Sequence, residues 1–247
     1  MPGKERLDKV LVDRGLVKSR ERAKALIMEG RVVVDGSGAV KAGTLVASDS
    51  DIALKGVDIP FVSRGGLKLQ AAMDYFSLDP TGMVAMDVGC STGGFTDCLL
   101  KRGVRRVYAV DVGYGQFDWT LRQDSRIVLI EKTNVRYLDR STVRDHIDLA
   151  VVDVSFISLL KVLPRVLEFL GEDGRVLALV KPQFEVGKGM VGKGGVVRDE
   201  SARLSALEKV SLGAVEAGFC VVGSFESPVV GSKGNREYFI YLRRDGR

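Results

Sequence analysis

Residues 83–100, MVAMDVGCSTGGFTDCLL, decide the fold of this chain. The apolar run Met83–Met86 followed by Asp87 predicts a buried strand, and the glycines at positions 89, 93 and 94 predict a turn into a helix. Such a turn brings free backbone N–H groups and the positive end of the helix dipole to one point, where glycine lets a ligand approach closely. The spacing matches neither the dinucleotide fingerprint nor a P-loop, so this stretch alone predicts a nucleoside-containing cofactor of undetermined kind.

Strands and helices alternate along the chain beyond this stretch. Apolar strands are expected at residues 107–110, 127–130, 148–154 and 175–180, helices at 157–170 and 199–217, and late strands at 220–225 and 238–242. This alternation predicts an α/β fold with a mainly parallel, doubly wound sheet. Polar residues gather at the ends of the strands, where such sheets bind ligands; they are Asp87, Asp111, Asn134, Asp153 and Lys181.

A small α+β unit is expected before this sheet. The spacing of Leu7, Val10 and Leu11 predicts one helix, and Ser19 is a suitable N-cap for a second. Short strands are expected at 32–34, 45–46 and 51–54, together in one small sheet. We place the small unit at residues 1–58, a linker at 59–63 and the large domain at 64–247.

The composition limits the possible partners. The chain has 247 residues and a net charge of +5, which permits a nucleic-acid partner without requiring one. Three cysteines lack the spacing of a metal site and His146 is the only histidine, so no metal is expected. No apolar run approaches the ~18 residues that span a bilayer, and no signal peptide is evident, which together with the cysteine usage favours a cytoplasmic protein without a membrane partner.

Asp111 narrows the choice of cofactor. It ends the strand that follows the glycine turn, roughly 20 residues beyond that turn, where a carboxylate can accept both hydroxyls of a ribose. This arrangement fits either NAD or S-adenosylmethionine. The turn lacks the dinucleotide spacing, and NAD would need a second phosphate cradle.

Several separated blocks carry a family resemblance. They are Asp87-x-Gly89-x-x-x-Gly93-Gly94, Ser91–Asp97, Asp111–Gln116, Thr133-Asn134-x-Arg136, Asp153–Leu159, Val180–Glu185 and Gly234-Asn235-x-Glu237. The first resembles motif I of Rossmann-like methyltransferases, and the set resembles the TlyA family of ribosomal RNA 2′-O-methyltransferases, which are often named haemolysins. The N-terminal blocks Arg6-Leu7-Asp8, Ser19-Arg20 and Val34-Asp35-Gly36 resemble the RNA-binding module first known from a small-subunit ribosomal protein.

The resemblance implies a function and a set of site residues. It implies methyl transfer from S-adenosylmethionine to a ribose 2′-hydroxyl, of a cytidine, in ribosomal RNA within an assembled or assembling ribosomal subunit. The wider FtsJ-like group uses a Lys–Asp–Lys–Glu tetrad, which falls here on Lys68, Asp153, Lys181 and Glu237, with Lys181 contacting the 2′-hydroxyl. A lysine suits this chemistry in either of two ways: it acts on the hydroxyl when it is partly deprotonated, which a second lysine nearby favours, or it stabilises the developing alkoxide. Asp153 and Glu237 are expected to hold the ammonium groups in place.

The remaining candidate residues bind the cofactor or the RNA. The expected cofactor residues are Asp87, Gly89, Cys90, Ser91, Gly93, Gly94, Phe95, Asp111, Val112, Asn134 and Asp153. The expected RNA-binding residues are Arg6, Lys18, Arg20, Arg22, Lys24, Arg64, Lys188 and Lys193. The last two lie in the glycine-rich stretch 185–197, which imitates a P-loop but has Gly194 where Ser or Thr is required; we expect a loop that closes over RNA.

Two other functions stay open. A non-catalytic RNA-binding protein with a degenerate methyltransferase fold predicts a broken tetrad or cofactor turn, and both are intact in the sequence. A membrane-acting haemolysin predicts a spanning or strongly amphipathic segment, and the sequence shows none.

Overall fold

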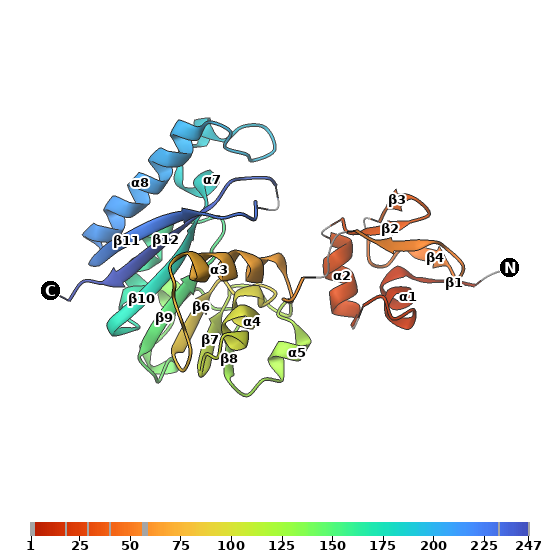
Figure 1. Cartoon of the computed structure of the whole chain (residues 1–247), viewed down its shortest axis with the longest axis horizontal. Coiled ribbons are helices and arrows are strands. Elements are labelled where there is room, and N and C mark those ends of the chain that lie inside the picture. Colours follow the sequence, from red (N-terminus) through yellow and green to blue (C-terminus); the bar gives the residue numbers. More distant parts are fainter. Residues whose placement is uncertain are drawn as a thin grey trace. The chain divides into compact units, whose positions relative to one another are not determined.

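The computed structural model describes all residues except 1–2, 18, 29, 40, 56–58, 232 and 247, and leaves the side chains of Glu21 and Lys188 undescribed. The chain divides into two compact units, Met1–Ser63 and Arg64–Arg247 (Figure 1).

The first unit combines two helices with two small antiparallel sheets. Its elements are β1 (Lys4–Arg6), α1 (Leu7–Asp13), α2 (Arg20–Met28), β2 (Val32–Val34), β3 (Ser37–Gly38), β4 (Leu45–Ala47) and β5 (Ile52–Leu54). The strand β2 pairs with β3 and β5, whereas β4 pairs with β1. The expectation that residues 45–46 join the same sheet is therefore wrong, because the extended segment before α1 supplies a separate partner. The expected cap is confirmed, since Ser19 Oγ accepts the N–H of Arg22 at 3.1 Å.

The second unit is built on a seven-stranded sheet. Its strands are β6 (Val84–Val88), β7 (Arg106–Val110), β8 (Ile127–Ile130), β9 (Ile147–Val152), β10 (Leu170–Val180), β11 (Phe219–Glu226) and β12 (Tyr238–Arg244). The spatial order is β11-β12-β10-β9-β6-β7-β8, in which β12 is antiparallel to both its neighbours and the other pairs are parallel. The mainly parallel α/β sheet is confirmed.

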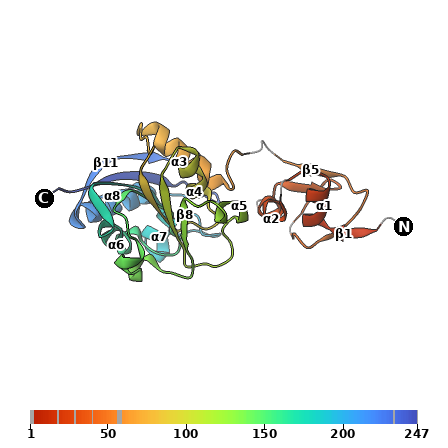
Figure 2. The ribbon, with the colours of Figure 1, turned by 90° about the horizontal axis from the view of Figure 1, so that it is seen from below.

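Helices cover both faces of this sheet. They are α3 (Arg64–Tyr75), α4 (Gly94–Lys101), α5 (Trp119–Arg122), α6 (Leu163–Leu167), α7 (Pro182–Glu185) and α8 (Glu200–Glu216), with 3₁₀ turns η1 (Val135–Tyr137), η2 (Arg140–Thr142), η3 (Leu159–Lys161) and η4 (Lys188–Met190). Figure 2 shows α3 and α4 on one face and α6 and α8 on the other. On the first face, Phe95 of α4 stacks on Phe239 of β12, with 6.0 Å between ring centroids. On the second, Val210 and Ala214 of α8 belong to the core cluster of Met86 and Ala178.

The predicted helix over residues 157–170 is wrong. The structure forms the turn η3 and then the short helix α6, and Leu170 already belongs to β10. Pro164 explains the break, because proline lacks an N–H to continue a helix from η3 but fits the first turn of a new one. The helix expected over 199–217 is confirmed as α8, which Asp199 caps by accepting the N–H of Ser201.

Candidate active site

The register of the sheet brings the predicted residues to one edge. Asp111, Asp153 and Lys181 each follow the last residue of a parallel strand, β7, β9 and β10. The antiparallel β12 begins at the same edge, because its first residue, Tyr238, pairs with Val180. Glu237 therefore lies beside the end of β10, next to Lys181 in the sheet register, although it is 56 positions further along the chain.

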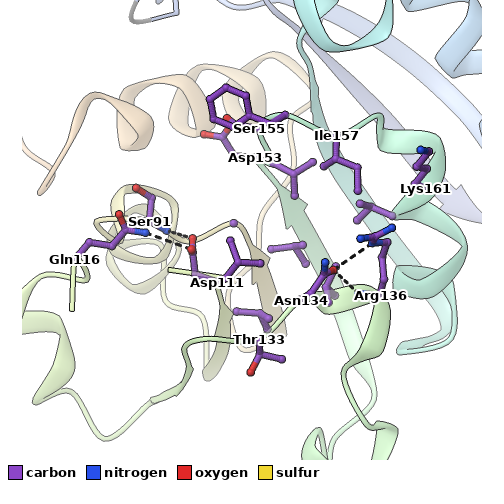
Figure 3. A pocket seen from close by; sticks show the side chains of 18 residues that line it. Ser91, Asp111, Gln116, Thr133, Asn134, Arg136, Asp153, Ser155, Ile157 and Lys161 are labelled. Atoms are coloured by element: carbon purple, nitrogen blue, oxygen red, sulfur yellow. Dashed lines mark hydrogen bonds between the residues drawn. The ribbon is translucent and has the colours of Figure 1, made fainter. Parts of the chain in front are cut away.

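A cavity of about 670 Å³ opens at this edge (Figure 3). Its lining consists of Val88, Gly89, Ser91, Val110, Asp111, Val112, Gln116, Thr133, Asn134, Val135, Arg136, Asp153, Val154, Ser155, Phe156, Ile157, Lys161 and Val162. Six of the expected cofactor residues are among them: Gly89, Ser91, Asp111, Val112, Asn134 and Asp153. The cavity thus has apolar walls with acidic and amide groups at separate points, which is typical of a small-molecule site.

Five of the expected cofactor residues lie outside this lining. They are Asp87, Cys90, Gly93, Gly94 and Phe95. All five are buried; Asp87 and Phe95, for example, are 0% and 3% exposed. These residues therefore do not form the wall of the cavity, and any direct contact with a cofactor stays a prediction.

Gly89 explains why the turn needs glycine. Its φ is +87°, and a Cβ at this position would lie 2.7 Å from the backbone oxygen of Asp153. The end of β6 and the end of β9 therefore approach each other more closely than any side chain allows. This approach holds the glycine turn and Asp153 against each other at the floor of the cavity.

Asp111 is held by the two loops around it. One carboxylate oxygen accepts the N–H of Ser91 at 2.8 Å, and the other accepts the N–H of Gly113 at 2.6 Å and the amide of Gln116 at 3.2 Å (Figure 3). The carboxylate is therefore fixed in orientation at the cavity wall. Ser91 adopts a left-handed φ of 48°, which is strained for a residue other than glycine.

Asn134 lies across the cavity from this carboxylate. Its side-chain oxygen accepts the backbone N–H of Arg136 at 3.1 Å and its guanidinium at 3.3 Å (Figure 3). Among the residues that the structure describes, none accepts a bond from its amide nitrogen. This nitrogen is available to donate a hydrogen bond to a ligand in the cavity.

The four tetrad residues form two ion pairs. Lys68 Nζ lies 2.6 Å from Glu237 Oε2, and these residues are 8% and 3% exposed. Lys181 Nζ lies 2.6 Å from Asp153 Oδ1 and donates to Ser155 Oγ at 2.9 Å. The first pair is buried and outside the cavity lining, whereas the second borders the cavity, because Asp153 and Ser155 are part of its lining.

Phe156 is a feature of the site that sequence reasoning did not assign. It is 90% exposed, has a φ of +64° and lines the cavity two residues after Val154. Its ring lies 5.1 Å from that of Phe184. An exposed aromatic ring on a strained backbone beside Asp153 indicates a binding surface rather than a core position. The one feature of the sequence that could have pointed to Phe156 is its position in Asp153–Leu159, one of the blocks that carry the family resemblance.

Glu185 is a second unassigned residue. It is 4% exposed, and it accepts the N–H of Leu159 at 2.8 Å and the hydroxyl of Ser158 at 2.6 Å. Burial raises the pKa of its carboxyl group above the usual range. Glu185 lies four residues after Lys181. Its bonds to Ser158 and Leu159 therefore link the helix that follows Lys181 to the loop that follows Asp153.

Asp87 is expected to make stability depend on pH. Burial raises the pKa of its carboxyl group to about 7, with Thr96 donating to one oxygen at 2.7 Å. The unfolded chain loses this proton near pH 4 and the folded chain near pH 7, so stability falls as the pH rises through that window. Relative to Asp87→Asn, the wild type should lose about 2 kcal/mol of unfolding free energy between pH 5 and pH 7. Denaturation at several pH values checks this; a constant difference between the two proteins would contradict the raised pKa.

Two of the expected RNA-binding residues in the first unit, Arg6 and Arg20, also form an ion-pair cluster with a buried aspartate. Arg6 and Arg20 both donate to the buried carboxylate of Asp8, at 3.0 and 2.8 Å, and hold its pKa at about 2. About half of each arginine side chain stays exposed, so both are fixed in position and still accessible to phosphate. Arg22 donates to the backbone oxygen of Val62 at 3.0 Å.

The other expected RNA-binding residues have varied settings. Lys24 and Lys193 are exposed, and Arg64 is the partly buried first residue of α3. Lys18 lies outside the described residues, as does the side chain of Lys188.

Metal ligands and membrane-spanning helices are both absent from the described residues. No three His, Cys, Asp or Glu side chains in that part of the chain gather as metal ligands would. Of the helices formed by the described residues, none has the length and apolar character needed to cross a membrane.

Comparison with known proteins identifies the family. The model of the FtsJ-like methyltransferases matches residues 61–244, and the model of the S4 domain matches residues 5–52. The 16S/23S rRNA (cytidine-2′-O)-methyltransferase TlyA of Mycobacterium tuberculosis is 45% identical over 98% of this chain and 91% of its own length. The chain belongs to the TlyA family of FtsJ-like methyltransferases.

Other members of the TlyA family have haemolysin names. Hemolysin A of Brachyspira hyodysenteriae is 38% identical over 96% of this chain and 99% of its own length. A solved structure from Streptococcus thermophilus with a hemolysin name is 43% identical, covers 99% of this chain and 90% of its own, and superposes with a TM-score of 0.78. Membership of the FtsJ-like group implies a cofactor of the S-adenosylmethionine type, and the S4 domain implies an RNA partner.

Proposed function

We propose that this protein transfers a methyl group from S-adenosylmethionine to the 2′-hydroxyl of a cytidine in ribosomal RNA. The observation that carries the proposal is the gathering of Lys181, Asp153, Lys68 and Glu237 at the edge of the sheet that holds the cavity. A degenerate, non-catalytic fold predicts a broken tetrad, whereas all four residues are present and paired. The relatives named as rRNA (cytidine-2′-O)-methyltransferases support the acceptor.

The residues of the cavity fit S-adenosylmethionine. We assign Asp111 to the ribose hydroxyls, because its fixed carboxylate lies at the end of the strand after the glycine turn. The amide nitrogen of Asn134 and the apolar side chains Val112 and Ile157 suit the adenine base, and Gly89 lets the methionine part approach the backbone. When bound, this cofactor supplies an electrophilic methyl group.

Lys181 and Asp153 act on the acceptor hydroxyl in this proposal. A ribose hydroxyl is a poor nucleophile, and negative charge develops on its oxygen as its proton passes to solvent water. The Lys181 ammonium, fixed by Asp153 and Ser155, stabilises that charge from the border of the cavity. The buried pair Lys68–Glu237, whose glutamate precedes β12 at the same edge of the sheet, supports this arrangement.

The S4 domain binds and positions the RNA in this proposal. Arg6, Arg20 and Lys24 provide positive charge on the first unit, and Lys193 provides it on the loop between α7 and α8. Such contacts to phosphate position an RNA without reading its sequence. We further propose a ribosomal subunit, assembled or assembling, as the physiological substrate in the cytoplasm, and the predicted units 1–58, 59–63 and 64–247 as RNA-binding module, linker and methyltransferase domain.

Phe156 is expected to hold the base of the target nucleotide. Its exposed ring borders the cavity, and stacking of a base on an aromatic ring contributes about 1–3 kcal/mol. Phe156→Ala should therefore lower kcat/KM for RNA by about 10- to 100-fold, whereas Phe156→Tyr, which keeps the ring, should stay within a few fold. Steady-state kinetics with RNA as the varied substrate test this. Equal losses in both variants would show that the ring is not what matters.

Transfer of labelled methyl groups tests the proposed function. Purified protein is incubated with S-adenosylmethionine labelled in the methyl group and with ribosomal subunits or the naked ribosomal RNA. Label is expected in the RNA and in none of the ribosomal proteins. Release of dye from liposomes by the same preparation, without methylation of RNA, would instead support a membrane-acting haemolysin.

A further inference from the structure

Asn235 is a buried polar residue that joins two segments distant in the sequence. It is 3% exposed and lies in the connection between β11 and β12. Its side-chain oxygen accepts the N–H of Val197 at 3.0 Å, and its amide nitrogen donates to the backbone oxygen of Gly195 at 2.9 Å. One side chain thus satisfies two backbone groups of the loop between α7 and α8.

The same connection also contains Glu237, whose carboxylate lies close to Gly231. The backbone oxygen of Asn235 accepts the N–H of Gly231 at 2.9 Å. A Cβ on Gly231 would lie 2.5 Å from Glu237 Oε1, so the carboxylate occupies the space that a side chain at this position would need. Glu237 in turn holds Lys68 at 2.6 Å. A shift of Gly231 would therefore disturb the place where this carboxylate lies.

The loop on the other side of Asn235 is the glycine-rich stretch with the exposed Lys193. Its end is folded back, because Gly192 donates to the backbone oxygen of Val196 and Gly195 donates to that of Gly192, both at 3.0 Å. Val197 is 1% exposed, so its N–H bond to Asn235 is sheltered from water. In Figure 1 the segment between α7 and α8 and the β11–β12 connection leave the sheet at the same end.

We propose that Asn235 is a positioning residue that couples this lysine-bearing loop to the Lys68–Glu237 pair. Contact of RNA with Lys193 then influences the position of the tetrad through the buried side-chain amide of Asn235. Asn235 itself touches no substrate; it acts through Glu237. This inference rests on the function proposed above, because it concerns the same tetrad.

An asparagine suits this position for a chemical reason. Its amide presents one acceptor and one donor in a single plane, matching the N–H of Val197 and the carbonyl of Gly195. Asn235→Asp would keep the acceptor but place a carboxylate oxygen against the Gly195 carbonyl. Asn235→Ala would remove both bonds and leave the two backbone groups unsatisfied.

The test compares Asn235→Ala with Arg236→Ala as its matched control. Arg236 is the next residue, and it forms an exposed ion pair with Glu226 at 3.1 Å. Asn235→Ala is expected to lower kcat for RNA methylation on the order of 100-fold, as a small misplacement of catalytic groups does. Its affinity for S-adenosylhomocysteine should stay within twofold, because none of these residues lines the cavity. Trypsin should cleave after Lys193 faster than in the wild type.

The outcomes separate the coupling from its alternatives. Unchanged kcat in Asn235→Ala, or the same loss in Arg236→Ala, would overturn the proposal. Loss of S-adenosylhomocysteine affinity together with kcat would also overturn it, because the damage would then extend to the cofactor cavity. A wild-type protein without methyltransferase activity would contradict the proposed function alone. Cleavage by trypsin would then test the coupling. Equal rates of cleavage after Lys193 in the wild type and in Asn235→Ala would refute it.

Discussion

Replacing Lys181 with alanine is expected to lower kcat for methyl transfer by about 10³-fold or more while S-adenosylhomocysteine still binds, since positioned acid–base and electrostatic groups each contribute 10² to 10⁴-fold. Lys181 is the ammonium that borders the cavity, held there by Asp153 at 2.6 Å and Ser155 at 2.9 Å. Its removal takes away the charge opposite the acceptor oxygen. It leaves the walls that would hold the cofactor, to which Lys181 does not belong.

Lys101→Ala is the matched control for this prediction. Lys101 also pairs with an aspartate, Asp97, at 2.9 Å, but its side chain is half exposed and lies at the C-terminal end of α4. The kcat of Lys101→Ala for methyl transfer should equal that of the wild type. Single-turnover methylation combined with calorimetric titration of S-adenosylhomocysteine makes both comparisons, and turnover retained by Lys181→Ala would remove Lys181 from the chemistry.

Lys68→Ala is expected to affect stability as strongly as activity. Its side chain is only 11% exposed and neutralises the 3% exposed carboxylate of Glu237. Removing one partner of a buried ion pair leaves an uncompensated charge and costs about 3–5 kcal/mol. We therefore expect a lower unfolding free energy of the methyltransferase domain, measured by urea denaturation, and no detectable methyl transfer.

The double variant Lys68→Met/Glu237→Leu separates these two effects. Apolar replacements of both partners remove the buried charges together, which is often neutral or stabilising. The double variant should therefore recover most of the stability that Lys68→Ala loses, yet remain inactive. Recovery of activity along with stability would show that the pair has only a structural role.

The C-terminal ends of the parallel strands in the large domain could be predicted from the sequence to within two residues. Continuous apolar runs such as Ile127–Ile130 and Val107–Val110 are typical of strands buried on both faces of a parallel sheet, and each parallel strand delivers its next residue to one edge. This is why the amino-acid sequence alone predicts that Asp111, Asp153 and Lys181 lie together. The position of Glu237 at that edge required the antiparallel insertion of β12, which local sequence does not encode.

Side-chain partners and strained backbones could not be predicted in this way. Nothing in the sequence decides that Lys68 pairs with Glu237 and Lys181 with Asp153, because that choice depends on where α3 packs on the sheet. The left-handed φ of Phe156 is likewise imposed by surrounding contacts rather than by phenylalanine itself. The helix predicted over 157–170 is wrong for a different reason. The apolar spacing favours one continuous helix, whereas a single proline, Pro164, is enough to interrupt it.

The nucleoside that receives the methyl group tests the central claim most directly. Ribosomal RNA methylated by the purified protein with labelled S-adenosylmethionine is digested to nucleosides, which are identified by mass spectrometry. The tetrad beside the cavity predicts label in a ribose-methylated nucleoside, and the relatives named as cytidine-2′-O-methyltransferases indicate 2′-O-methylcytidine. RNA treated with Lys181→Ala should carry no such label. Label on a base, or no label in RNA at all, would contradict the account.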